Sequence, residues 1–188
     1  MSEIKIGIVV GSLRRESFNR KLAGALIKLA PGHFKFKYLR IDDLPLYNED
    51  DDPAPPASAI RLKQEIRDSD ALLFVTPEYN RSIPGVLKNA LDHASRPYGQ
   101  SAWAGKPAGM LGISVGPLGT AVAQMHLRTI AAYLDMPTLG QPEIYLTMKD
   151  DLFDSSGAVG GEKRSVLQKW VERYVAWVEQ HVQEQAAA

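Results

Sequence analysis

The chain has 188 residues, long enough for one domain with a complete hydrophobic core, and we expect a single domain over residues 1–188. Its 22 lysines and arginines balance its 22 aspartates and glutamates, so the composition predicts neither a nucleic-acid-binding face nor an acidic docking surface. The absence of cysteine excludes disulfides, thiolate metal sites and a cysteine nucleophile, and the four histidines lack the spacing of metal ligands. No apolar run is long enough for a membrane span and the first residues do not resemble a signal peptide, so we expect a cytoplasmic protein with no membrane partner.

The first predicted element is a short buried strand over residues 5–10, which is rich in β-branched side chains and too short for a helix. A hydroxyl-rich loop over residues 11–19 follows, and apolar residues then recur at helical spacing from residue 22 to residue 29. A strand that passes through such a loop into a helix gathers free backbone N–H groups and the positive end of the helix dipole at one place. The segment therefore predicts an anion site, most often one for phosphate.

The residues of this loop decide which kind of phosphate site is possible. Gly11 is its only glycine, so the loop is not a G-x-G-x-x-G turn, and no Gly-Lys-Ser/Thr follows as in a Walker A loop. Four polar side chains would take the place of glycine N–H groups as phosphate ligands: those of Ser12, Arg14, Ser17 and Asn19. Taken alone, the loop fits equally well with an ordinary strand–turn–helix whose serines only cap the helix.

Strands and helices alternate along the rest of the chain. A half-buried strand is predicted over residues 34–39, a long proline-rich loop over 41–56, and then a helix capped by Ser58. The further elements are a strand over 71–75, a helix from Pro84, a strand over 107–113, a helix over 120–134, a strand over 144–146, a glycine-rich loop over 150–161 and a final amphipathic helix. Five alternations predict an α/β fold with a doubly wound parallel sheet and helices on both faces.

Sheets of this kind bind their ligands at the carboxyl ends of the strands, beside the switch point. Three loops leave strand ends in that position, over residues 12–19, 77–80 and 114–119. Their convergence favours a phosphate site in the first loop over simple helix capping.

Two of these loops carry motifs that resemble the NAD(P)H-dependent FMN reductases, a flavodoxin-like family that includes bacterial quinone, chromate and azo-dye reductases. The first motif is Gly11-Ser12-Leu13-Arg14 with Ser17-Phe18-Asn19. The second is Thr76-Pro77-Glu78-Tyr79-Asn80, continued by Ser82-Ile83-Pro84-Gly85 and Leu87-Lys88-Asn89-Ala90. The resemblance extends over nearly the whole chain. It implies a flavodoxin-like, doubly wound sheet of five parallel strands in the order 2-1-3-4-5, with helices on both faces, forming one FMN-binding domain.

The resemblance also implies which residues hold a noncovalent FMN. The phosphate and the start of the ribityl chain would lie against Ser12, Arg14, Ser17, Phe18 and Asn19. The isoalloxazine edge would lie along Pro77, Glu78, Tyr79 and Asn80. Ser114 and the backbone near Gly116 would meet the pyrimidine side of the ring, although this third loop departs from the more glycine-rich run of several relatives. Amides, hydroxyls and one guanidinium are the groups that a dianionic phosphate requires.

The activity that the resemblance implies is carried by the flavin, and no side chain is expected to be catalytic. NAD(P)H would be the co-substrate, and two electrons would pass by a ping-pong mechanism to quinones or other electron-poor acceptors such as chromate and azo compounds. The sequence leaves the physiological acceptor open. It also leaves the choice between NADH and NADPH open, because no basic pair outside the flavin loops can be assigned to a 2′-phosphate.

Two other functions compete with this one. Residues 112–116 form a literal G-x-S-x-G, so a serine hydrolase with Ser114 as its nucleophile is an alternative, with an aspartate and His181 following in the required chain order. The loop after Ser114 is prolonged, however, where a nucleophile elbow would lead straight into its helix. A flavodoxin-type electron carrier is the other alternative, but such carriers are strongly acidic and this chain is neutral.

The sequence also predicts a homo-oligomer, either a dimer or a tetramer built from dimers. The loop over residues 44–56 holds more apolar and rigid material than a solvated loop needs. The helix from Pro84 is expected to display His93 and to run into Arg96-Pro97-Tyr98, a mixture enriched at interfaces. In the resembling family, dimers form around the flavin sites and several members pair again. Arg128 and Glu143 resemble charged positions at that second contact.

Overall fold

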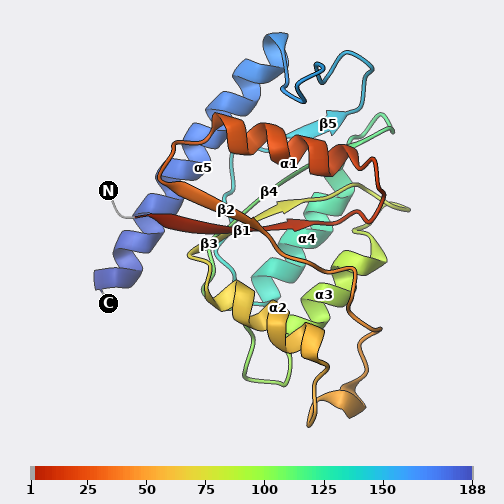
Figure 1. The fold of residues 1–188 in the computed structure, drawn as a ribbon, viewed down its shortest axis with the longest axis vertical. Coiled ribbons are helices and arrows are strands. Elements are labelled where there is room, and N and C mark those ends of the chain that lie inside the picture. Colours follow the sequence, from red (N-terminus) through yellow and green to blue (C-terminus); the bar gives the residue numbers. More distant parts are fainter. Residues whose placement is uncertain (1–2, 188) are drawn as a thin grey trace.

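The computed structural model describes residues 3–187 (Figure 1). Within them, five strands form one parallel sheet in the order β2-β1-β3-β4-β5, which confirms the flavodoxin-like topology. The strands are β1 (Ile4–Val10), β2 (Phe34–Tyr38), β3 (Ala71–Val75), β4 (Ala108–Ser114) and β5 (Tyr145–Thr147). The helices are α1 (Phe18–Leu29), α2 (Ala57–Arg67), α3 (Gly85–Ser95), α4 (Ala121–Tyr133) and α5 (Gly161–Ala187), with a short 3₁₀ helix, η1 (Glu49–Asp51), before α2.

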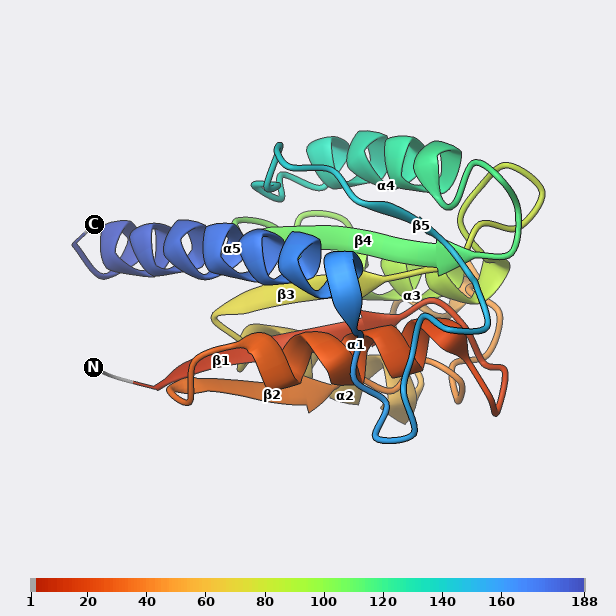
Figure 2. The same ribbon diagram turned by 90° about the horizontal axis from the view of Figure 1, so that it is seen from above.

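The helices cover both faces of the sheet, as the alternation of elements predicts. α1 and α5 pack on one face, and α2, α3 and α4 pack on the other (Figure 2). Because successive strand residues point to opposite faces, Ile6 and Ile8 enter the core under α1 and α5, whereas Val9 enters the other core. All five strands are parallel, so their carboxyl ends share one edge of the sheet.

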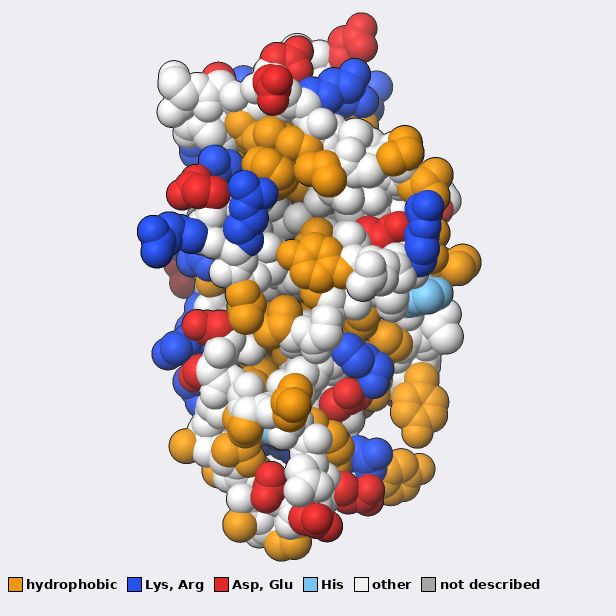
Figure 3. All heavy atoms as spheres, turned by 90° about the vertical axis from the view of Figure 1, so that its right-hand side faces the viewer, with side chains coloured by type: hydrophobic (Ala, Val, Ile, Leu, Met, Phe, Trp, Pro, Cys, Tyr) orange, Lys and Arg blue, Asp and Glu red, His pale blue; other side chains and the backbone are white. Residues whose placement is uncertain are grey.

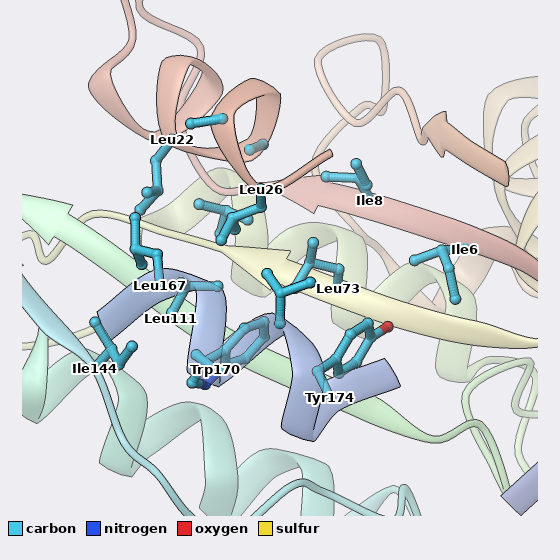
Figure 4. Close-up of a cluster of buried hydrophobic side chains, with 14 of the residues drawn as sticks. Ile6, Ile8, Leu22, Leu26, Leu73, Leu111, Ile144, Leu167, Trp170 and Tyr174 are labelled. Atoms are coloured by element: carbon cyan, nitrogen blue, oxygen red, sulfur yellow. The ribbon is translucent and has the colours of Figure 1, made fainter. Parts of the chain in front are cut away.

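Two stacked aromatic rings of α5 organise the core under α1 and α5 (Figure 4). The ring centroids of Trp170 and Tyr174 lie 5.3 Å apart with an interplanar angle of 10°, and both side chains are buried. Burial raises the pKa of Tyr174, so its hydroxyl stays protonated and donates a 2.9 Å hydrogen bond to the carbonyl of Leu72. A Cβ at Gly109 would lie only 2.6 Å from the Tyr174 ring, which explains a glycine near the start of β4.

Two local expectations are wrong. The N-cap of α2 is Pro56 and no side chain caps this helix, so Ser58 lies inside the first turn. His93 is not displayed on the surface of α3, because the residue is only 5% exposed. Its Nε2 donates to the carbonyl of Pro45 at 2.8 Å, and its ring meets the edge of Tyr47.

The proline-rich loop before α2 packs on α3 of its own chain. The carboxamide of Asn89 accepts from the N–H of Tyr47 and donates to the carbonyl of Pro45, both at 2.8 Å. Part of the proline-rich loop that is predicted to contact a second subunit therefore packs against its own chain. The charged pair expected at another subunit contact also forms within one chain, where Arg128 Nε lies 3.0 Å from Glu143 Oε1.

Candidate functional site

The loops that follow β1, β3 and β4 meet at the carboxyl edge of the sheet, the face that Figure 3 presents. Thr76, directly after β3, is fully buried between them. A Cβ at Gly11 would lie 2.3 Å from the Thr76 hydroxyl oxygen, and a Cβ at Gly112 would lie 2.0 Å from the Thr76 carbonyl oxygen. The two glycines therefore let the neighbouring strands approach Thr76 closely. The sequence places Thr76 in the second motif but carries no sign of this central position.

The first loop combines helix capping with free hydrogen-bond donors. Ser17 is the N-cap of α1, and its Oγ accepts the N–H of Arg20 at 3.3 Å, so this serine does cap the helix. Capping leaves the first-turn N–H groups of Phe18 and Asn19 without an acceptor among residues 3–187. Together with the half-buried Ser12, these groups form a donor cluster at the positive end of the α1 dipole. The two interpretations of the loop are thus compatible, and the cluster suits a phosphate.

The side chain of Asn19 has a structural task that the sequence does not reveal. Its Nδ2 donates to the carbonyl of Ile113 at 2.9 Å, and its Oδ1 accepts the N–H of Ile113 at 3.0 Å. The residue is only 3% exposed, so the carboxamide ties the start of α1 to β4 in the interior. Its backbone N–H is therefore the group that remains for a ligand.

Arg14 supplies a cation beside this donor cluster. Its guanidinium carbon lies 4.8 Å from the centroid of the Phe18 ring, a cation–π contact that orients the side chain at the start of α1. Among the described residues no carboxylate forms an ion pair with Arg14, so its charge is available to an anion.

The second loop contains a tight two-residue turn. Tyr79 and Ser82 exchange two backbone hydrogen bonds of 3.0 Å each, and the residues between them, Asn80 and Arg81, have φ angles of 51° and 64°. Positive φ at both central positions is the geometry of a type I′ turn, which asparagine tolerates better than most residues. The turn holds the Tyr79 ring about half exposed beside the buried Pro77.

The carboxylate of Glu78 is committed to α4. Its Oε2 accepts the N–H groups of Val122 and Ala123, both at 3.0 Å, and the side chain is only 7% exposed. The N-cap residue of α4, Thr120, makes no capping bond of its own, so Glu78 caps this helix from the second loop. This carboxylate oxygen is therefore part of the scaffold, and the position of Glu78 along a ring edge stays a prediction.

The third loop is closed by its own hydrogen bonds. The N–H of Gly116 donates to Ser114 Oγ at 3.3 Å, and the carbonyl of Gly116 accepts from Gly119 N–H and Thr147 Oγ1. Among the described residues, no histidine ring is hydrogen-bonded to Ser114, and His181 instead bonds the carbonyl of Trp177 on α5. The serine-hydrolase alternative is therefore wrong, because Ser114 lacks the base of a triad.

The part of the chain that the structure describes contains neither a candidate metal site nor a helix suited to span a membrane. No cluster of three or more His, Cys, Asp or Glu side chains in it could hold a metal ion. Nor does any described helix have the length and apolar character that crossing a membrane requires. The carboxyl edge of the sheet carries the donor cluster of α1, the guanidinium of Arg14 without an ion pair, and a rigid turn with the half-exposed ring of Tyr79.

Residues 4–151 match the family model described as NADPH-dependent FMN reductase. The chain belongs to this family. It is 54% identical to a 2-hydroxy-1,4-benzoquinone reductase of a Burkholderia species over 93% of this chain and 96% of that one, and 51% identical to a quinone reductase of Pseudomonas putida over 95% and 97%. Among solved structures it is similar to the flavoenzyme NAD(P)H:(acceptor) oxidoreductase FerB of Paracoccus denitrificans, with a TM-score of 0.90, 44% identity and coverage of 95% and 98%.

Membership of the FMN reductase family makes the chain an oxidoreductase with FMN as cofactor and NAD(P)H as co-substrate. The donor set at the start of α1 fits the phosphate end of FMN, since hydroxyls, helix N–H groups and a guanidinium are what a phosphate monoester binds.

Proposed function

We propose that this chain is an FMN-dependent NAD(P)H:quinone reductase. The observation that carries the proposal is the convergence at one edge of the free donors of α1, Arg14 and the rigid turn that presents Tyr79. The printed names of the two relatives above, which match nearly the whole chain, support quinones as the acceptor class.

In this proposal the first loop holds the FMN phosphate. Ser12, Ser17 and the backbone N–H groups of Phe18 and Asn19 would donate to its oxygens, and Arg14 would balance its charge. The dipole of α1 adds a favourable interaction with the dianion. The Asn19 carboxamide contributes indirectly, because it fixes the start of α1 against β4.

The other two loops would hold the ring. The backbone of residues 77–80 is stiffened by Pro77 and by the paired bonds of the turn, so it can lie along a flat edge without reorganising. Ser114 and the backbone at Gly116 would face the pyrimidine side. The Ser114 hydroxyl would be the donor near the atoms where negative charge develops, because the N–H of Gly116 is bonded to Ser114 Oγ. Bound FMN supplies the hydride acceptor for NAD(P)H and the two-electron donor for the acceptor substrate.

The kinetic consequence is a ping-pong mechanism in which donor and acceptor use one open face in turn. Initial rates with NADPH, measured at several benzoquinone concentrations on FMN-loaded protein, should give parallel double-reciprocal lines. Intersecting lines would contradict the single-face proposal, because both substrates would then bind together. Chromate and an azo dye in the same assay test whether the acceptor range extends beyond quinones, as we propose. A flavodoxin-type carrier, the remaining alternative, would show no turnover with any of them.

We further propose a homo-oligomer, a dimer or a tetramer, in the cytoplasm. The proline-rich loop is less suited to a subunit interface than its sequence suggests, because it bonds to α3 of its own chain. Tyr98 and Tyr133, however, are 84% and 81% exposed. Both line one surface hollow of about 910 Å³ beside α3 and α4. Exposed aromatic side chains of this kind are enriched at interfaces. Light scattering should give a multiple of the 20.7 kDa chain mass, and a monomeric mass with full activity would contradict the oligomer.

A further inference from the structure

A second hollow, which we call the arginine groove, lies on the β2 side of the first loop. It has a volume of about 670 Å³ and runs between the residues that follow β1 and those that follow β2. Its charged lining residues are Arg14, Arg15, Arg20, Arg40 and Asp42. Lys and Arg side chains gather along one side of the face that carries the strand ends (Figure 3). A chain with no net charge thus concentrates cations at this edge.

Three of these arginines, Arg14, Arg15 and Arg20, have no counter-charge within the described chain. The charge of Arg40 is balanced by two carboxylates, because its Nε lies 2.8 Å from Asp42 Oδ1 and its Nη1 lies 3.7 Å from Asp43 Oδ2. The hydrogen bond from Arg40 lowers the pKa of the Asp42 carboxyl, so Asp42 is ionised at neutral pH. No described carboxylate forms an ion pair with Arg15 or Arg20, the two arginines of this set that do not face the predicted FMN phosphate. Like charges held close together repel one another, so the groove favours an anionic occupant.

The walls of the arginine groove also suit a nucleoside. The guanidinium carbon of Arg20 lies 4.6 Å from the centroid of the Tyr38 ring, which holds the planar cation at the groove wall. Leu13, 56% exposed, adds apolar surface on the opposite loop. A guanidinium plane stacks on flat rings and binds phosphate oxygens in pairs. The volume lies in the range of pockets that bury small ligands.

We propose that the arginine groove binds the 2′-phosphate and adenosine end of NADPH, with Arg15 and Arg20 as its phosphate ligands. The proposal rests on the function proposed above, since the nicotinamide must reach the same edge of the sheet. The 2′-phosphate is a phosphomonoester dianion that NADH lacks, so the unpaired arginines make NADPH the preferred donor. Arg14 is not assigned to this site, because its charge serves the FMN phosphate.

The kinetic test compares NADPH with NADH as donor for the wild-type protein, Arg15→Gln, Arg20→Gln and the double variant, each loaded with FMN. Each single substitution should lower kcat/KM for NADPH about tenfold through a higher KM, and should change kcat/KM for NADH less than about twofold. The matched control is Arg173→Gln, because Arg173 is an exposed arginine of α5 away from the groove. This variant should keep the wild-type kcat/KM for both NADPH and NADH. Equal losses for both nucleotides, or no loss for either, would overturn the proposal.

A binding measurement separates the groove from catalysis. Isothermal titration of the FMN-loaded protein with adenosine 2′,5′-bisphosphate and with 5′-AMP should show tighter binding of the bisphosphate, and the double variant should lose this difference. Equal binding of the two nucleotides to the wild-type protein would overturn the 2′-phosphate assignment. Weaker FMN binding by Arg15→Gln or Arg20→Gln would overturn it too, because the arginines would then serve the flavin. Failure to oxidise NADPH or NADH would contradict the proposed function alone, since the titration still tests the groove.

Discussion

Removing the carboxylate of Glu78 should destabilise the protein through α4. Its Oε2 accepts two N–H groups at the start of this helix, from Val122 and Ala123, at 3.0 Å each. Because the helix has no other side-chain cap, Glu78→Ala leaves both donors without their acceptor. Arg81 lies 3.6 Å away with its side chain 65% exposed, so its loss of a partner adds little.

The magnitude follows from the number and type of these bonds. A hydrogen bond to a charged group contributes about 1.5–3 kcal/mol, and loss of a helix cap costs about 0.5–2 kcal/mol. Water can reach the freed donors in part, so we expect Glu78→Ala to lower the free energy of unfolding by about 2–3 kcal/mol. Glu78→Gln keeps an acceptor and loses only the charge at the positive end of the helix, which is worth about 1 kcal/mol.

Thermal unfolding of FMN-free protein is the appropriate assay, because bound FMN would add its own stabilisation. For a chain of this length, Glu78→Ala should lower Tm by about 4–12 °C and Glu78→Gln by about 2–4 °C. Glu172→Ala, on the exposed face of α5, is the matched control and should leave Tm nearly unchanged. A Glu78→Ala protein that melts at the wild-type temperature would refute the capping role.

Three further predictions test the site and its scaffold. Asn19→Ala strands the buried N–H and carbonyl of Ile113 and should cost about 2–4 kcal/mol in urea unfolding, and a cost below about 0.5 kcal/mol would contradict that role. Gly112→Ala places a Cβ 2.0 Å from a backbone oxygen and should prevent folding or cost more than about 3 kcal/mol of stability. Gly140 has open space around it, so Gly140→Ala is the control and should be nearly neutral. Equal stability of the two variants would refute the packing argument. Arg14→Ala should weaken FMN binding by about 1.5–3 kcal/mol, and unchanged affinity in a fluorescence titration would remove Arg14 from the phosphate site.

The fold could be predicted because its signals are local. Short apolar runs such as β1 and β3 lie within one segment and have the length of buried strands. The strand order required the resemblance, since pairing depends on contacts between segments far apart in the chain. The meeting of the three loops could also be predicted, because parallel strands bring their carboxyl ends to one edge.

The roles of individual side chains could not be predicted in the same way. Asn19 bonds a residue 94 positions away, and Glu78 bonds residues 44 and 45 positions away. A polar residue in a binding motif can serve the ligand or the scaffold, and only the folded partner distinguishes the two. The arginine groove escaped prediction for the same reason, because Arg15, Arg20 and Arg40 come together only when β2 pairs with β1.

An anaerobic redox titration of the FMN-loaded protein tests the proposed chemistry most directly. One equivalent of NADPH should bleach the visible absorbance of the bound flavin, and one equivalent of benzoquinone added afterwards should restore it, with NADP⁺ and hydroquinone as products. Protein that binds no FMN, or whose flavin stays oxidised with NADPH and NADH alike, would contradict the account.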